Sequence, residues 1–452
     1  MIFKGIRAEI IPVLGHSCAQ MAKAAAGSFQ PAEGQGTTSP FMGFKPSLAM
    51  LAAIYVFPLL MVSTASFVIP LLALWIWWPI SSLTGTSRLA RLLAALITTA
   101  LGIFPALLLY AVQTNALPYS LVAQLQVPGG WVLATLLMLA VFVVLRDLLW
   151  LLAALTGRQG MAQLIHIPAI TVGALVVAGG LSAIGVFNAL QPPRVIEQPL
   201  LVRHLPPALE GLRVAVLADI HASPVNDARY VKTIVDRTMG AAPDLIVLPG
   251  DLVDGDAASG RANVAPLARL SARYGVWAAP GNHEYYSGYN SWMAEFRNLG
   301  LNLLENRMQV INIKGSKLAL SGIGDPVYGR TSPNNANPDV PEGIPPDVDA
   351  VAKQARKAGA QFHILLAHQP KFARLNATKG VNLQISGHTH GGLIAGLDQW
   401  VVAPVNNGFV RGEYEIGNMK LFVSSGSGLW AGFAVRLGVL PRIEILTLTA
   451  EK

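Results

Sequence analysis

The stretch VNLQISGHTHGG, residues 381–392, indicates the fold more directly than any other part of this sequence. Its first residues favour a short β-strand, and they lead directly into two histidines that are two positions apart. Glycines beside the histidines let the backbone turn tightly where the strand ends. This arrangement predicts a strand whose carboxyl end carries the side chains of a binding site.

Four further apolar runs end in the same way. They are VAVLA-DIH (214–221), LIVL-PGDLVD (245–254), VWAA-PGNHE (276–284) and ILLA-HQP (364–370). Helix-compatible stretches such as 226–239, 290–299 and 349–359 lie between them. Short β-rich runs that alternate with helical stretches predict an α/β domain whose strands are buried on both faces. Ligands of such sheets gather outside the carboxyl ends of the strands, so we expect the five ends to form one site.

Histidine usage supports a metal site. The chain has nine histidines, and five of them fall at the strand ends: His221, His283, His368, His388 and His390. Asp219, Asp251 and Asn282 stand beside them in the same motifs. Carboxylate, imidazole and amide ligands without thiolate favour Mn, Fe or Zn over a soft metal. These donors exceed the needs of one tetrahedral zinc ion, and a carboxylate such as Asp251 can bridge two ions about 3.5–4 Å apart.

At these motifs the sequence resembles the calcineurin-like metallophosphoesterases, over roughly residues 211–450. The motifs that carry the resemblance occur in the family's order: DIH (219–221), GDLVD (250–254), GNHE (281–284), AHQP (367–370) and GHTHGG (387–392). The chain is also similar to the bacterial membrane-tethered branch, through SGHTHGG and the closing stretch SSGSGLWAGFAVRLG. It departs from that branch at Leu393, where a glutamine or similar polar residue is usual.

The resemblance implies a four-layer α/β sandwich around two mixed β-sheets. It also implies a phosphoester hydrolase in which hydroxide bound to two divalent metal ions attacks phosphorus. The implied ligands are Asp219, His221 and His390 for the first ion, Asp251 as the bridge, and Asn282, His368 and His388 for the second. His283 is implied as the acid that protonates the leaving oxygen, oriented by Asp254.

The N-terminal half of the chain carries almost no charge. Four apolar runs, roughly 50–78, 92–113, 131–153 and 167–189, have the length of about 20 residues that a bilayer-spanning helix needs. Four such runs in series favour membrane helices over the buried core of a soluble protein, and they predict an all-α transmembrane bundle of about four helices. We expect an N-terminal tail and linker (1–47), transmembrane helices (48–190), a connector (191–210) and a catalytic domain (211–452).

The placement of arginines predicts the orientation in the membrane. Arg88 and Arg91 open the second run, and Arg146 and Arg158 flank the end of the third. Because Lys and Arg are retained on the cytoplasmic side, we expect a multi-pass protein of the cell (inner) membrane whose catalytic domain is extracytoplasmic. The basic residues of the tail disagree with this orientation, and a re-entrant first run is the alternative.

The composition agrees with this division. Of the 452 residues, 52% are hydrophobic and 13% are charged, against about 25% charged in soluble domains. Residues 1–193 hold eight basic and three acidic side chains, a net +5, and residues 194–452 hold the other +3. The basic excess therefore flanks the predicted membrane helices, and we expect a lipid bilayer rather than nucleic acid as the partner. The single cysteine, Cys18, excludes an internal disulfide and a cysteine-ligated zinc ribbon.

Three functional hypotheses follow from these observations. The first is a membrane-anchored hydrolase that cleaves a phosphoester or pyrophosphate bond of a phosphorylated small molecule or lipid. The second narrows the substrate to a lipid-linked phosphate or a lipid-sugar diphosphate. The third, from another class, is a membrane sensor or transporter with a regulatory phosphatase domain. The scarcity of polar residues in the predicted spans disfavours this third hypothesis.

Three weaker signals remain. Two of them have two interpretations each, and the third has a structural one. Arg436 is a phosphate contact or a member of a structural ion pair. The Pro/Asn/Gly-rich stretch 325–349 is a flap over the substrate or a surface insertion. His363 stands within a strand rather than at its end, and we expect it to be structural.

Overall fold

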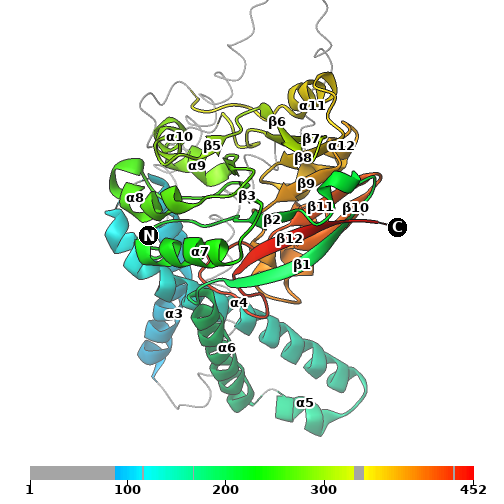
Figure 1. Ribbon diagram of the computed structural model, residues 1–452. Helices are drawn as coiled ribbons and strands as arrows, with labels where there is room; N and C mark the ends of the chain where they lie inside the picture. Colours follow the sequence, from blue (N-terminus) through cyan, green and yellow to red (C-terminus); the bar gives the residue numbers. More distant parts are fainter. Residues whose placement is uncertain (1–86, 115–116, 166, 330–340, 431–432, 452) are drawn as a thin grey trace, which may run out of the picture. The chain divides into compact units, whose positions relative to one another are not determined.

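The computed structural model describes residues 87–114, 117–165, 167–329, 341–430 and 433–451. The tail 1–47 and the first predicted span, 50–78, lie outside the described residues. Beyond residue 193 the chain forms two six-stranded sheets with helices on their outer faces (Figure 1). The α/β class and the two mixed sheets that the sequence predicts are thereby confirmed.

The first sheet has the strand order β1-β12-β2-β3-β4-β5. Only β12 and β2 are antiparallel neighbours, and every other pair is parallel. The bounds are β1 Arg194–Val202, β2 Arg213–Val216, β3 Leu245–Leu248, β4 Val276–Ala278, β5 Asn302–Leu303 and β12 Arg442–Ala450. Three of the five predicted strands, β2, β3 and β4, are therefore parallel neighbours that end on the same side.

The second sheet has the order β10-β11-β9-β8-β7-β6. Its outer pairs, β10 with β11 and β6 with β7, are antiparallel, and the inner pairs are parallel. The bounds are β6 Arg307–Ile313, β7 Ser316–Gly322, β8 Phe362–Leu366, β9 Leu383–Ser386, β10 Gly412–Ile416 and β11 Met419–Val423. The two remaining predicted strands, β8 and β9, lie side by side at the centre of this sheet.

The connector predicted at 191–210 contains β1, which pairs with β12 in parallel over its whole length. Pro199 lies inside β1, and a proline within a run speaks against a central strand. The strand is formed because β1 is the edge of its sheet, where a residue without an N–H costs no ladder bond on the free side.

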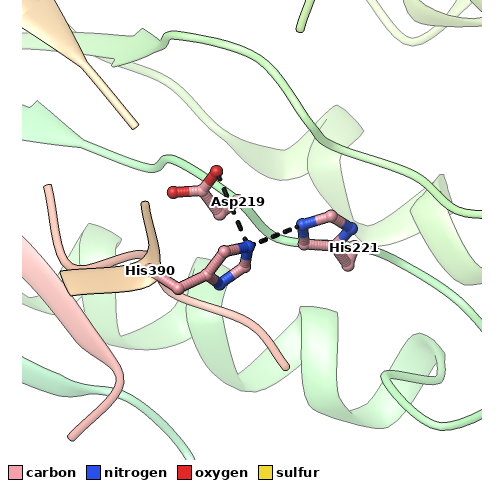
Figure 2. Close-up of side chains that lie close together, drawn as sticks. All are labelled: Asp219, His221 and His390. Carbon is pink, nitrogen blue, oxygen red and sulfur yellow. Dashed lines mark hydrogen bonds and ion pairs between the residues drawn. The ribbon is translucent and has the colours of Figure 1, made fainter. Parts of the chain in front are cut away.

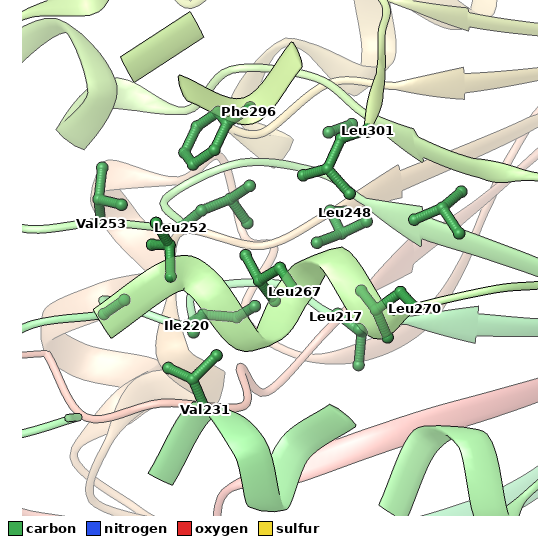
Figure 3. Packing of buried hydrophobic residues seen from close by; sticks show 14 of the residues in the cluster. Leu217, Ile220, Val231, Leu248, Leu252, Val253, Leu267, Leu270, Phe296 and Leu301 are labelled. Atoms are coloured by element: carbon green, nitrogen blue, oxygen red, sulfur yellow. The ribbon is translucent and has the colours of Figure 1, made fainter. Parts of the chain in front are cut away.

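Alternating residues of the strands build two separate cores. Val214 and Val216 of β2 point between the sheets, where they meet Ile364 and Leu366 of β8. Leu217, which follows β2, lies on the opposite face, beneath the helices (Figure 3). A third apolar cluster joins β8 and β11 to the helices on the far side of the second sheet. The packing order is therefore helices, sheet, sheet, helices.

Helices cover the first sheet because their apolar residues share one face. In α7 the buried residues are Val231, Ile234, Val235 and Thr238, which follow the spacing of a helix face. Asp227 begins this helix by accepting hydrogen bonds from two backbone N–H groups of its first turn. The helices packed on the first sheet are α7 Ala228–Gly240, α8 Ala257–Val264, α9 Asn282–Ser287 and α10 Tyr289–Asn298. Helices α11 Val348–Lys357 and α12 Ala373–Ala377 pack on the second sheet, and α13 Asp398–Val405 follows later in the chain. Short 3-10 turns are η1 Pro207–Leu209, η2 Ala265–Arg269, η3 Pro370–Phe372 and η4 His390–Gly392.

Before residue 190 the described chain is helical. Its helices are α3 Arg88–Thr114, α4 Tyr119–Leu155, α5 Gln159–Ile165 and α6 Pro168–Ala189. Helix α4 begins well before the predicted span 131–153 and continues through Pro128.

Within the described residues, Gln124–Leu155 and Ala169–Ala189 are long and apolar enough to cross a bilayer. Only about a third of the residues in their most apolar parts are buried, so most of this apolar surface faces outward. The predicted bundle of four membrane helices is not confirmed by these two.

Candidate metal centre

The predicted strand ends meet at one place between the two sheets. The backbone N–H of Asp219, after β2, donates to the carbonyl of Gly250, after β3. In the second sheet, Gly387, after β9, donates to the carbonyl of His368, after β8, at 3.0 Å. The sheets are joined where the N–H of His388 donates to Asp219 Oδ1 at 2.8 Å. The parallel order of the strands therefore places all five motifs around one centre.

The backbone at this centre is strained. Five residues that the sequence singles out as metal ligands have positive φ angles, between 46° and 73°: Asp219, His221, Asp251, His388 and His390. Residues with a β-carbon avoid this left-handed region and occupy it where the surrounding structure forces them to. The strain turns the side chains inward instead of letting them alternate as they would in a continuing strand.

One group of donors consists of Asp219, His221 and His390, one ligand atom of each lying within 4.8 Å of the others. Figure 2 shows the two imidazoles facing each other beside the carboxylate, with 3.1 Å between their Nε2 atoms. Asp219 Oδ1 is 4.0 Å from His390 Nε2. All three side chains are buried. A cation between them would find two nitrogen ligands and one oxygen ligand.

A second group consists of Asp251, His368 and His388, whose ligand atoms also lie within 4.8 Å of one another. Asn282, the first residue of α9, joins this group because its Oδ1 lies 2.9 Å from His388 Nδ1. Asp251 Oδ2 lies 3.0 Å from His368 Nε2 and 3.8 Å from His221 Nε2, which belongs to the first group. Asp251 therefore stands between the two groups.

His283 and Asp254 lie beside the two donor groups. His283 Nδ1 is 2.5 Å from Asp254 Oδ1, and the same oxygen is 3.0 Å from His221 Nδ1. The backbone N–H of His283 donates to Asp251 Oδ1 at 2.8 Å. Asp254 therefore holds the Nδ1 sides of two imidazoles, which leaves their Nε2 atoms to face the centre.

The donors fit a metal better than they fit one another. Asp219 Oδ2 is buried and has no hydrogen-bond partner among the described residues. Buried polar atoms without partners are rare, and a bound ion is one of their ordinary explanations. Oxygen and imidazole donors without thiolate also match the predicted preference for Mn, Fe or Zn.

The carboxylates control the protonation of the imidazoles. Burial lowers the pKa of His283, but Asp251 and Asp254 raise it more, and the result is a pKa of about 9. His368 behaves in the same way, with a pKa of about 10, chiefly because of Asp251. Burial and, to a smaller extent, the charge of nearby His368 lower the pKa of His388 to about 3. Two imidazoles are thus favoured as cations and one is held neutral within the same centre.

Glu284 is a member of the centre for which the sequence predicted no role. Its carboxylate is buried and accepts hydrogen bonds from the backbone N–H groups of Asp251, Leu252 and Gly281. It therefore ties the GDLVD loop to the GNHE loop. Burial, together with the charge of Asp251, raises the pKa of Glu284 to about 6. The only signal in the sequence was its place in the GNHE motif.

Arg436 is fully buried behind His390, and neither role expected for it accounts for its contacts. Its guanidinium donates to the carbonyls of Ser425 at 2.6 Å, Gly428 at 2.8 Å and His390 at 3.3 Å. Its Nη2 also lies 3.2 Å from His390 Nδ1. Among the described residues no carboxylate forms an ion pair with it, so its acceptors are three carbonyls and an imidazole. Burial lowers the pKa of Arg436 to about 10.

The other weak signals have the following outcomes. His363 lies in β8 with its Nε2 2.7 Å from Ser321 Oγ, as expected of a structural histidine. Residues 330–340 lie outside the described residues, so the flap hypothesis stays open. Asp325, which precedes them, is buried and accepts a hydrogen bond from Gln369 at 2.7 Å.

The chain matches one protein family and resembles several named proteins. Residues 212–392 match the calcineurin-like phosphoesterase family. A transmembrane protein with a metallophosphoesterase domain from Bos taurus is 33% identical over 290 residues, which are 61% of this chain and 62% of that protein. A zebrafish (Danio rerio) protein of the same description is 30% identical over 297 residues, 62% of this chain and 63% of its own length. The chain thus spans less than two thirds of these two relatives.

A metallophosphoesterase from Aquifex aeolicus is 30% identical over 262 residues, which are 57% of this chain and 92% of that protein. This chain therefore covers nearly the whole of this relative. This chain belongs to the calcineurin-like phosphoesterases.

Proposed function

We propose that the protein is a membrane-anchored, dinuclear metal-dependent hydrolase of phosphoester or pyrophosphate bonds. One observation carries the proposal: the predicted donors form two adjacent groups, and Asp251 lies within 4 Å of an imidazole from each. A shared carboxylate between two nitrogen-containing groups is the arrangement that a pair of divalent ions needs. The family to which the chain belongs supports the same reaction class.

In this proposal each residue has one role. Asp219, His221 and His390 hold one ion, Asn282, His368 and His388 hold the other, and Asp251 bridges them. Two bound ions would neutralise the charge of the phosphoryl group and lower the pKa of water. His283 protonates the leaving oxygen, and Asp254 orients the imidazole of His283.

Two properties of His283 support its role as the acid. Its pKa of about 9 keeps the imidazole protonated at neutral pH. Its Nδ1 is engaged by Asp254, so the proton on Nε2 is the one available to a substrate. About a fifth of the side chain is exposed (19%), whereas the His221 side chain is fully buried, so His283 is the more accessible of the two imidazoles that Asp254 holds.

The test uses the full chain purified in detergent and supplied separately with Mn, Fe, Co or Zn. We expect hydrolysis of a generic phosphodiester, two metal ions per chain, and loss of both with Asp251→Asn. His283→Gln is the matched variant, because it should abolish turnover of a substrate with a poor leaving group while both ions remain bound. Absence of hydrolysis with every metal would contradict the proposal.

We also propose that the chain spans the cell membrane and that the catalytic domain is extracytoplasmic. Outward-facing leucines and valines on α4 and α6 support a lipid environment, because water-soluble domains seldom expose so much contiguous apolar surface. The test is protease treatment of intact cells or spheroplasts. Digestion of the catalytic domain before lysis is expected, and digestion only after lysis would place the domain in the cytoplasm.

One further contact, between the metal-centre rim and the apolar helices, favours a lipid-linked phosphate or a lipid-sugar diphosphate as the substrate class. Leu393 and Ile394, just after His390, pack in one cluster with Leu139 of α4 and Ala178 of α6. The rim of the metal centre therefore rests on the helices proposed to lie in the bilayer. We expect a polyprenyl diphosphate in vesicles to be hydrolysed with a higher kcat/KM than a water-soluble short-chain analogue. Equal values would exclude this narrower substrate class and leave the general one.

A further inference from the structure

The apolar helices contact a loop of the catalytic domain through two glycines. A β-carbon on Gly130 of α4 would lie 2.7 Å from the backbone nitrogen of Ala434, and one on Gly185 of α6 would lie 2.5 Å from Val435 Cγ1. Real β-carbons essentially never make contacts this short, so glycine is what lets the backbones approach. The N–H of Arg436 also donates to the carbonyl of Gly185 at 2.9 Å. We call residues 433–437 the docked loop.

The docked loop contacts the metal centre through the side chain of Arg436. The backbone of Arg436 is bonded to α6, and its side chain extends to His390. There the guanidinium donates to the carbonyl of His390 and lies beside the imidazole ring. The same guanidinium donates to the carbonyls of Ser425 and Gly428, so it joins the loop after β11 to the segment at His390. A buried guanidinium with this many acceptors is rigid, because each hydrogen bond lost would leave a buried donor without a partner.

The segment after His390 is held by the same loop. The N–H of Leu437 donates to the carbonyl of Leu393, and the N–H of Ala395 donates to the carbonyl of Leu437, both at 2.9 Å. His390 itself has a positive φ of 48°, a conformation that persists where neighbours enforce it. The docked loop supplies these neighbours.

We infer that helices α4 and α6 are a structural part of the metal centre, with Arg436 as the positioning residue that connects them to His390. The close contact with Gly130 and Gly185 fixes the position of the docked loop, and the hydrogen bonds of Arg436 thereby fix the backbone and ring of His390. Disturbing the contact at these two glycines therefore weakens metal binding although no ligand is changed. The inference rests on the proposed role of His390 as a metal ligand.

The experiment introduces one methyl group at this contact. Gly185→Ala places a β-carbon against Val435, whereas Gly180→Ala, on the same helix, places one where nothing lies within 4 Å. Both changes alter helix propensity equally, so Gly180→Ala is the matched control. The readout is the rate at which the metal-loaded full chain, in detergent, releases its ions to an excess of chelator, followed by a chromogenic metal indicator.

We expect Gly185→Ala to release metal about 10- to 100-fold faster, the size of effect seen when groups behind a metal ligand are changed. Gly180→Ala should release metal at the wild-type rate. The double variant Gly185→Ala with Val435→Ala removes the atom that the new methyl meets, and should restore slow release. Equal rates for the two glycine variants, or no recovery in the double variant, would overturn the inference.

A second variant covers the case in which Gly185→Ala does not fold. Arg436→Lys keeps the positive charge but cannot reach three carbonyls at once. Release should again be faster, while thermal unfolding of the chelated protein shows that the domain is folded. Wild-type release from Arg436→Lys would also contradict the inference. Failure of the wild-type chain to bind metal would instead contradict the proposed function, so the two failures are distinguishable.

Discussion

Replacing Asp254 by Asn should produce a loss of activity that depends on pH. The carboxylate of Asp254 lies 2.5 Å from His283 Nδ1 and, with Asp251, raises the pKa of His283 from the usual 6.5 to about 9. Asp251 remains in the variant, so the pKa falls part of the way from about 9, and 6.5 is the limiting value if Asp254 supplies the whole rise. At pH 8 the protonated fraction of His283 then drops from about 90% to as little as about 3%, and at pH 6 it drops only from about 100% to about 75%.

Turnover that requires protonated His283 should follow these fractions. The loss in Asp254→Asn is expected to be severalfold and at most about 30-fold at pH 8, and to stay below about twofold at pH 6. The assay is phosphate release from an alkyl phosphoester, because an alkoxide must be protonated as it leaves. A nitrophenyl ester serves as the control substrate, since nitrophenolate leaves without a proton and its hydrolysis should be much less affected.

One alternative has to be separated from this result. Asp254 also lies 3.0 Å from His221 Nδ1, so its replacement could act by loosening a proposed metal ligand. The metal content of the variant is therefore measured at each pH, and saturating metal is supplied. A loss that is the same at pH 6 and pH 8, or the same for both substrates, would refute the reasoning from His283.

Three further predictions concern stability and metal binding. Burial, aided by Arg356, lowers the pKa of His363 to about 4. Its stabilising contribution is therefore complete above pH 6.5 and declines as the pH falls through 4, by about 3 kcal/mol in all. The wild-type chain should accordingly lose more Tm between pH 7 and pH 4.5 than His363→Gln, and an equal loss would contradict this. In Glu284→Gln the NH₂ of the new amide faces a backbone N–H that the carboxylate had accepted. The free energy of unfolding of the chelated protein should therefore fall by about 1–3 kcal/mol, as measured by thermal unfolding. An unchanged stability would mean that other contacts hold the two loops. Removing metal from the wild-type chain should lower its Tm, because ions bind the folded centre and not the unfolded chain; a Tm unaffected by chelator would argue against structural coupling.

The fold and the clustering of the candidate site residues were predictable because their signals are local. A strand such as β3 is a run of four buried apolar residues, and Asp251, a proposed ligand, follows within three positions. Parallel order then brings such ends together without any knowledge of side-chain contacts. The repetition of this pattern five times gave the α/β class and the place of the metal centre.

The parts that were not predictable depend on partners far away in the chain. Pro199 argues against a strand at this place when the local sequence is considered alone. Only the pairing of β1 with β12, more than 200 residues later, shows that β1 is an edge strand. Gly185 is one of several glycines in α6, and nothing in the local sequence distinguishes it from Gly180, which faces open space. Arg436 could be recognised as chemically able to hold an anion, but its acceptors include three carbonyls, one from His390 and two from the loop after β11.

Leu393 shows how these distant contacts change the meaning of a local departure. The bacterial membrane-tethered branch usually has a polar residue at this position, and its absence raised the question of whether the substrate-facing surface is less polar. In the structure Leu393 has a φ of 62°, which is unfavourable for a leucine, and its side chain packs with residues of α4 and α6. A glutamine in the same place would bury its amide against apolar helices at a cost of about 1–3 kcal/mol. Leucine at this position therefore serves the contact with the helices, and the polarity of the substrate pocket has to be judged from other residues.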